Sequence, residues 1–243
     1  MILIIITGPT ASGKTYLANK LHKNLDNSLV INTDSYYRDN LFIKWLSNFI
    51  DSIYDRIISI KKNELIKTID SIKKNKKLIN FCYYDFNVKK STRLVKKIDI
   101  DNQNNILIVE GIFAHRLGLN YKNTINILCK DKKQLCYKRR LKRDLLYRNS
   151  TFEKVNKQFE KSWYLYYKYI SSYLDFNQVY EVNTFDNISF QKLITKLNKK
   201  IINKKNQREK IKLFPFDFSI WLEILLVKIR YFYFLTSGAF IPS

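Results

Sequence analysis

The chain has 243 residues, 46% of them apolar and 15% aromatic, and 44 Lys and Arg against 21 Asp and Glu leave a formal charge of +23. This length and apolar content support a folded core, which excludes a disordered polyelectrolyte. Three Cys without a C-x-x-C pair exclude a disulfide framework and a zinc ribbon, and with two His we expect no His-ligated metal site. The expected compartment is therefore a reducing cytoplasm.

The positive charge has two explanations. Lys outnumbers Arg 34 to 10, and Gly occurs only 5 times, which is the usage that AT-rich codons produce. Much of the charge is then background on solvated helix faces, and the alternative is a functional basic surface. Because Arg, and not Lys, is the residue suited to bidentate phosphate recognition, we expect no nucleic-acid partner.

In chain order, five short apolar runs are predicted as buried strands: residues 1–7, 28–32, 106–109, 124–129 and 178–182. The intervening stretches are predicted as helices: residues 14–25, roughly 41–74, 132–147, 151–173 and 189–203. Strands that alternate with helices are typical of an α/β domain with a mostly parallel central sheet flanked by helices. No internal repeat or flexible linker separates these elements.

The segment after the first strand is Gly8-Pro9-Thr10-Ala11-Ser12-Gly13-Lys14-Thr15, which matches G-x-x-x-x-G-K-[ST]. In such a loop the backbone N–H groups and the helix N-terminus surround phosphates, the Lys reaches the β- and γ-phosphates, and the hydroxyl of the last residue binds Mg²⁺. We therefore expect a three-layer P-loop NTPase fold. The expected nucleotide contacts are Gly8, Thr10, Ala11, Ser12, Gly13, Lys14 and Thr15.

Two acidic residues follow other predicted strands. Asp34 comes after residues 28–32, where it could accept a proton from an attacking hydroxyl, and Glu110 comes after residues 106–109, where it would lie beside Mg²⁺ or its waters. Each of them alone could be a helix cap or a surface turn. Together with the P-loop they favour a phosphotransferase site.

Four of the ten Arg lie within ten residues, at Arg139, Arg140, Arg143 and Arg148. Spacings of three and four residues place several of these guanidinium groups on one helix face. Arg neutralises a transferring phosphoryl group, so we predict an Arg-rich helical lid at about residues 131–150, with Arg139 and Arg140 on the nucleotide. The alternative is a solvated basic helix face.

These motifs together resemble the uridine–cytidine kinase branch of the phosphoribulokinase/uridine kinase family of P-loop kinases, over roughly residues 2–200. Besides the P-loop, Asp34-Ser35-Tyr36-Tyr37-Arg38 is similar to the family's D-S-F-Y-R, and Tyr84-Asp85-Phe86 to its Y-D-F. Glu110-Gly111-Ile112-Phe113-Ala114 is similar to E-G-I-L-A, and residues 139–148 to R-R-x-x-R-D-x-x-x-R. Both the order and the spacing of these motifs agree.

The resemblance implies transfer of the γ-phosphate of ATP (or GTP) to the 5′-hydroxyl of a nucleoside, with uridine or cytidine as the first candidates. It makes Asp34 the general base, gives Lys14 and Arg143 catalytic roles, and assigns Mg²⁺ to Thr15 and Glu110. The substrate contacts that it implies are Asp34, Tyr37, Asp55, Tyr84, Arg140, Arg143 and Arg148. Family members commonly form homo-oligomers, so we expect one here.

The departures from the family pattern lie on the base side. The family's base-binding His, which lies beyond Y-D-F, has no counterpart in residues 87–93. The family's ribose-binding segment D-H-P-x-A-F-D is matched only loosely, by a segment that ends at Asp55. The Gly and the last Arg of the lid's R-G-R are Asn149 and Ser150. Kinase chemistry is thus better supported than the identity of the acceptor.

The C-terminal region differs from the rest. We divide the chain into a P-loop kinase domain, residues 1–207, and an apolar helical extension, residues 208–243, whose charges recur too often for a transmembrane helix. The extension is expected to pack on the domain or at a subunit contact, or alternatively to associate weakly with a membrane surface.

Two other functions remain open. The P-loop wording also resembles that of tRNA dimethylallyltransferases, although their later G-G-T-G-L-Y segment is missing. The residues expected to contact the base and ribose differ from the family pattern. The chain could therefore also be a degenerate nucleotide-binding module that acts by binding a partner and not by catalysis.

Overall fold

The computed structural model describes residues 1–46, 49–50, 53–97, 106–119, 124–148, 150–170, 174–175 and 178–213. Contacts divide the chain into two units, Met1–Thr195 and Lys196–Ser243. In the second unit the description covers the continuation of helix α6 (Asn187–Leu213). The predicted apolar extension beyond Leu213 lies outside the described residues, and the predicted domain boundary at residue 207 stays a prediction.

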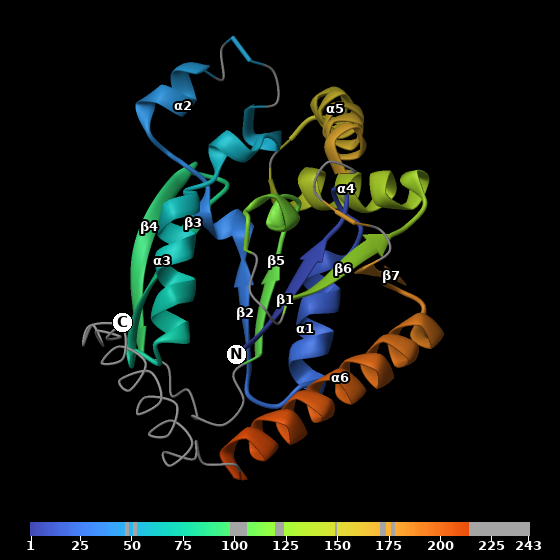
Figure 1. Ribbon diagram of the computed structural model, residues 1–243. Coiled ribbons are helices and arrows are strands. Elements are labelled where there is room, and N and C mark those ends of the chain that lie inside the picture. Colours follow the sequence, from blue (N-terminus) through green and yellow to red (C-terminus); the bar gives the residue numbers. More distant parts are fainter. Residues whose placement is uncertain are drawn as a thin grey trace, which may run out of the picture. The chain divides into compact units, whose positions relative to one another are not determined.

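The first unit contains a five-stranded sheet with the order β2-β5-β1-β6-β7, in which every neighbouring pair is parallel (Figure 1). The strands are β1 (Ile2–Thr7), β2 (Ser28–Asn32), β5 (Ile106–Glu110), β6 (Thr124–Lys130) and β7 (Val179–Asn183). All six residues of β1 and all five of β5 are buried, which explains their continuous β-branched and apolar sequence. The predicted α/β class is confirmed.

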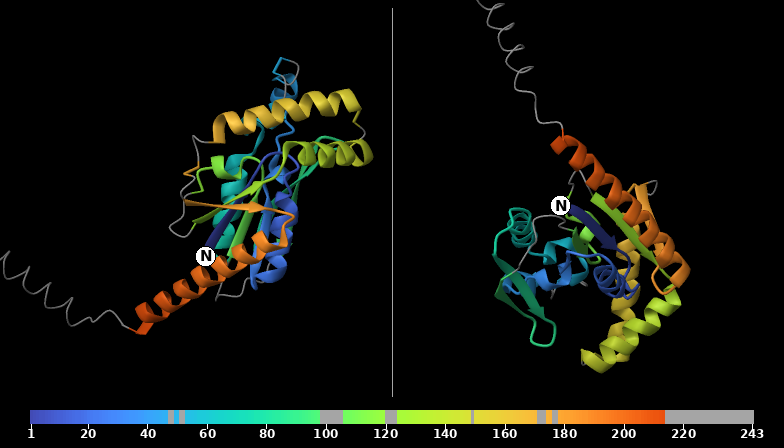
Figure 2. Two further views of the ribbon diagram at one scale, coloured as in Figure 1. Left: turned by 90° about the vertical axis from the view of Figure 1, so that its right-hand side faces the viewer. Right: turned by 90° about the horizontal axis from the view of Figure 1, so that it is seen from below.

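Helices flank this sheet. Helix α1 (Lys14–Asn24) packs on β1, β2 and β5, while the core that contains Leu3 and Ile5 of β1 is completed by α3 (Lys62–Lys73) and α5 (Phe152–Ile170). Because successive β1 side chains point to opposite faces, its apolar run fills the core on both sides of the sheet. Helix α4 (Lys133–Tyr147) packs against α5 (Figure 2). Its bounds agree with the predicted lid helix.

The single helix predicted at roughly residues 41–74 is wrong. The described residues form a short α2 (Leu41–Leu46), two 3₁₀ turns (Ile53–Asp55 and Ile57–Ser59) and then α3. The chain is extended around Ile60 because its backbone pairs with Tyr37: Lys61 donates to the Tyr36 carbonyl at 2.7 Å, and Arg38 donates to the Ser59 carbonyl at 2.7 Å. These bonds compete with helix formation and place Asp55 beside the end of β2.

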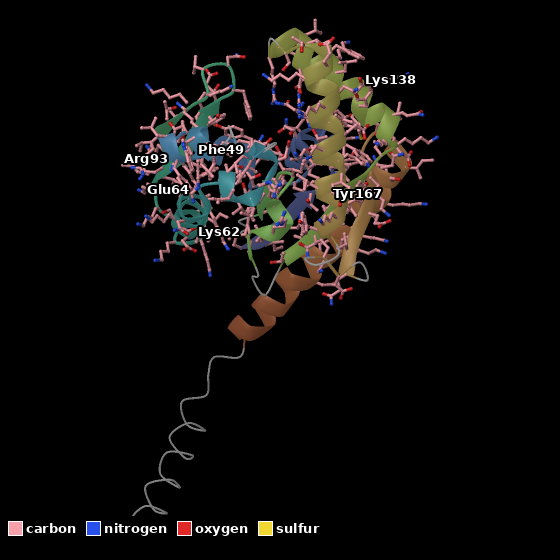
Figure 3. The ribbon with its side chains drawn as sticks, turned by 90° about the horizontal axis from the view of Figure 1, so that it is seen from above. Phe49, Lys62, Glu64, Arg93, Lys138 and Tyr167 are labelled. Carbon is pink, nitrogen blue, oxygen red and sulfur yellow. The ribbon has the colours of Figure 1, made fainter. Side chains whose placement is uncertain are left out.

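A second sheet, which the sequence did not predict, is the antiparallel hairpin of β3 (Leu78–Asp85) and β4 (Lys90–Lys97). Its turn is closed by the Asp85 carboxylate, which accepts from the N–H groups of Asn87 and Val88 at 2.8 and 3.2 Å. The hairpin packs on α3, where Arg93 lies 3.4 Å from Glu64 (Figure 3). This packing turns Tyr84 inward.

Candidate functional site

The P-loop joins β1 to α1. Gly13 (φ 90°) and Ala11 (φ 57°) adopt left-handed backbone conformations, which turn the chain into the first turn of α1. At Gly8 a Cβ atom would lie 2.8 Å from the Cys129 carbonyl of β6, so the loop lies against the neighbouring strand. The Lys14 ammonium donates to the Pro9 carbonyl at 2.9 Å and so lies folded over the loop.

The two predicted carboxylates meet at the carboxyl ends of the strands. Asn32, the last residue of β2, is in register with Glu110 of β5, and Asp34 follows in the 3₁₀ turn that begins at Thr33. The Thr15 hydroxyl donates to Glu110 Oε1 at 2.9 Å. The residues proposed for Mg²⁺ are therefore in direct contact, and a hydroxyl plus one carboxylate is a ligand set that Mg²⁺ uses together with substrate phosphates.

Burial and charge set the protonation of this group. Burial, together with the neighbouring charge of Asp34, raises the pKa of Glu110 to about 7, against the opposing effect of Lys14. A divalent cation would reverse this effect by stabilising the carboxylate. Asp34 Oδ1 is buried and has no hydrogen-bond partner in the described part of the chain. An acceptor atom left unpaired in this way is available to a substrate hydroxyl.

The predicted lid arginines lie on α4. Arg140 donates through Nη1 to the Thr10 hydroxyl of the P-loop at 3.1 Å, which ties the helix to the loop. Arg139 is paired with Asp131, and its guanidinium carbon lies 3.9 Å from the ring centre of Phe185. The guanidinium of Arg148, at the end of the helix, lies 4.2 Å from the ring centre of Phe86.

A cavity of about 320 Å³ brings most of the predicted residues together. The predicted residues that line it are Thr10, Ala11, Gly13, Lys14, Thr15, Asp34, Tyr37, Asp55, Glu110, Arg139, Arg140, Arg143 and Arg148. Gly8 and Ser12 are buried in the loop behind the cavity, and Tyr84 lies in a neighbouring cavity. Residues from five separate segments thus converge at one edge of the sheet.

The neighbouring cavity, of about 400 Å³, shares Tyr37, Asp55, Phe86, Arg140 and Arg148 with the first and also contains Tyr84. One of its walls is aromatic: the Tyr37 ring centre lies 5.5 Å from that of Tyr84 and 5.8 Å from that of Phe86. Such a wall suits a flat aromatic ring. Burial raises the pKa of Asp55, an effect that the positive charge of Arg140 opposes.

Several residues at the site were not predicted as functional, among them three aromatic ones. Tyr16 and Phe86 line the first cavity, and Phe185 stacks on Tyr16 with ring centres 5.2 Å apart. The position of Tyr16, immediately after the P-loop Thr15, was a signal that could have identified it. Phe185 follows β7, and only the packing of that strand beside β6 brings it to the P-loop.

Comparison with known proteins agrees with this geometry. The family model "Phosphoribulokinase / Uridine kinase family" matches residues 3–180. The chain belongs to the phosphoribulokinase/uridine kinase family. This is the family that the complete set of motifs indicated. The P-loop sequence alone also resembled that of tRNA dimethylallyltransferases.

Individual members of the family are similar over most of their own length. The uridine kinase of Ureaplasma parvum is 33% identical over 165 residues, which cover 66% of this chain and 77% of that protein. The uridine kinase of Borrelia duttonii is 30% identical over 175 residues, which cover 70% and 81%. Among solved structures, the YGR205w protein superposes with a TM-score of 0.55 at 14% identity, covering 74% of this chain and 85% of that one. This likeness supports the shared fold.

Two further observations concern partners. Within the part of the chain that the structure describes, no helix has the length and apolar character to cross a membrane. The same residues contain no cluster of three or more His, Cys, Asp or Glu side chains that could hold a metal ion by itself.

Proposed function

We propose that this kinase transfers the γ-phosphate of ATP or GTP to the 5′-hydroxyl of a nucleoside, with uridine and cytidine as the first acceptors to test. The observation that carries the proposal is the shared cavity, in which the unpaired oxygen of Asp34 lies with Lys14 and the lid arginines. Phosphoryl transfer needs alignment and neutralisation of charge more than covalent chemistry. This cavity supplies cations on one side and a proton acceptor on the other.

Each group has a defined task in this proposal. Asp34 accepts the proton of the attacking hydroxyl, and Lys14 leaves the Pro9 carbonyl to bind the β- and γ-phosphates. Arg140 and Arg143 neutralise the phosphates from the side of α4. Thr15 and Glu110 would hold Mg²⁺, which neutralises phosphate charge when it is bound.

The donor base has a platform beside the P-loop. Tyr16 and Phe185 stack with an interplanar angle of 21°, and Arg139 covers Phe185. Stacking and cation–π contacts hold a purine without distinguishing adenine from guanine, which supports both ATP and GTP as donors.

The acceptor ring belongs in the second cavity. Tyr37, Tyr84 and Phe86 would pack on a base, and the Asp55 carboxylate, at the junction of the two cavities, would accept from ribose hydroxyls. This placement puts the 5′-hydroxyl toward Asp34. It uses Asp55, the last residue of the loose match to the family's ribose-binding segment.

The test is ADP release by the purified full chain with ATP, Mg²⁺ and a panel of acceptors that includes uridine, cytidine, adenosine, nicotinamide riboside and pantothenate. We expect release that depends on a pyrimidine nucleoside and that is absent with 5′-deoxyuridine, which lacks the reacting hydroxyl. Release that no acceptor stimulates would favour a nucleotide-binding module and refute the proposal.

A homo-oligomer and a cytoplasmic location stay predictions.

A further inference from the structure

One carboxylate on α4 holds the lid arginines that surround it. Asp144, which is only 3% exposed, accepts from Arg140 Nε at 3.2 Å and from Arg143 Nε at 2.7 Å, and Arg148 Nε lies 3.7 Å away. Arg140 and Arg143 precede it on the helix, while Arg148 follows one turn later. Two of these three contacts span four residues of the helix, and the third is to the adjacent residue.

The same nitrogen of each guanidinium faces this carboxylate. An Arg side chain has five N–H groups in a rigid planar fork, and the single Nε–H is the one nearest the helix. When Nε–H is directed at Asp144, the four Nη–H groups of that Arg remain for another ligand. Arg140 already shows this division, because its Nη1 reaches the Thr10 hydroxyl of the P-loop at 3.1 Å.

We propose that Asp144 is a positioning residue that orients Arg140, Arg143 and Arg148 before the phosphates arrive. Asp144 also lines the second cavity, but its negative charge would repel a phosphate, so we assign it no contact with the transferring group. Its contribution is to fix, through Nε, three side chains that all line the first cavity, so that their Nη groups are left for the phosphates. This inference rests on the proposed phosphotransferase function, whose chemistry it refines.

The local charges agree with this role. Three guanidinium groups around one carboxylate leave two net positive charges for an anion, and without the carboxylate the three cations would repel one another. Burial by itself would raise the pKa of Asp144, but the hydrogen bond and charge of Arg143, with the charges of Arg148 and Arg140, lower it. Asp144 is therefore ionised at neutral pH, as the role requires.

The experiment compares Asp144→Asn, Asp144→Glu and the control Glu160→Gln in the full chain. Glu160 of α5 forms an exposed ion pair with Lys133 at the start of α4, so the control removes an acidic partner of an α4 cation without touching the cavity. The readouts are kcat and KM for ATP with the best acceptor, and the thermal midpoint of each variant.

Misorientation of groups by about 1 Å costs about 100-fold in rate, so we expect kcat of Asp144→Asn to fall by about 10- to 100-fold. KM for ATP should change by less than about threefold. Removal of a negative charge favours ATP binding, and this offsets the binding lost when the arginines are no longer oriented. Asp144→Glu keeps the charge on a longer arm and should recover part of kcat, while Glu160→Gln should match the wild type within about twofold.

Three results would overturn the inference. The first is a folded Asp144→Asn with wild-type kcat, and the second is a raised KM with unchanged kcat, which would make Asp144 a binding contact. If Asp144→Asn does not fold, the third is a folded Asp144→Glu whose kcat equals that of the wild type.

If the wild type transfers no phosphate to any acceptor, the proposed function fails by itself. The role of Asp144 is then decided by calorimetric titration of the wild type and Asp144→Asn with inorganic tripolyphosphate and with sulfate. Oriented guanidinium groups favour the anion that matches their geometry. The affinity ratio of tripolyphosphate to sulfate should fall by at least about fivefold in Asp144→Asn. An unchanged ratio would refute the positioning role.

Discussion

Gly111 offers a sharp test of how β5 is joined to the site. It follows Glu110 directly, with φ 157°, and a Cβ atom there would overlap Thr33 Oγ1 and lie 2.9 Å from Thr33 Cβ. Thr33 is completely buried and begins the 3₁₀ turn that carries Asp34. Gly111→Ala must therefore move that turn or the end of β5.

The magnitude follows from the contacts. Forcing a methyl group into a packed interior lowers the free energy of unfolding by about 1–3 kcal/mol. Because the new methyl group would meet atoms close to the backbone of buried Thr33, we expect Gly111→Ala at the upper end, about 3 kcal/mol. Gly118→Ala is the matched control. Gly118 also has positive φ, at 66°, but the nearest atom that a Cβ would meet is Lys62 Nζ at 3.8 Å, so only backbone strain of about 1 kcal/mol applies.

The assay is urea denaturation of the wild type and both variants, followed by circular dichroism. We expect Gly111→Ala to lose about 2 kcal/mol more than Gly118→Ala, and Thr33→Ala in the Gly111→Ala background to recover part of the loss because it removes Oγ1. Equal destabilisation by the two glycine variants would refute the assigned steric conflict.

Three further variants test the buried charges and the nucleotide contacts. His115 is half-buried with its Nδ1 2.7 Å from the Thr7 hydroxyl, and loss of solvation lowers its pKa to about 3. Between pH 6.5 and 3 the unfolded chain binds a proton that the folded chain excludes, so stability falls as the pH drops. His115→Gln should reduce the loss between pH 6.5 and 5 by about 2 kcal/mol in urea denaturation, and identical pH profiles would contradict this. Lys14→Ala removes the cation at the β- and γ-phosphates and should lower kcat by at least about 100-fold while the thermal midpoint stays within a few degrees; retained turnover would exclude the assigned role. Phe185→Ala removes the stacking platform and should raise KM for ATP and GTP alike, by about 5- to 100-fold, and a selective effect on one donor would exclude base-indifferent stacking.

The parallel sheet was predictable because its signal is local. Residues 1–7 and 106–109 are unbroken apolar runs, and these are the strands that the structure buries completely. The break between Leu46 and Lys62 was not predictable, because residues 41–74 contain neither Gly nor Pro. It arises from long-range hydrogen bonds of residues 59–61 to residues 36–38. The lysine-rich β4 has little apolar pattern of its own, and β3 supplies the buried residues of the hairpin.

The phosphate side of the site was predictable for a similar reason. The P-loop is one continuous motif, and Asp34 and Glu110 each follow a strand, so parallel topology alone brings them together. The pairing in the aromatic platform was not predictable, because Phe185 carries no motif and lies far from Tyr16 in the chain. Asp144 stood inside the arginine motif, but its contacts to three side chains required the structure.

In the proposed reaction, Asp34 takes the proton of the attacking hydroxyl in this cavity. The most direct measurement is the turnover of Asp34→Asn with ATP, Mg²⁺ and the best nucleoside acceptor, beside its affinity for ATP measured by calorimetry. We predict that turnover falls by about 10²- to 10⁴-fold while ATP affinity stays within a few fold of the wild type. Wild-type turnover in Asp34→Asn would contradict the claim.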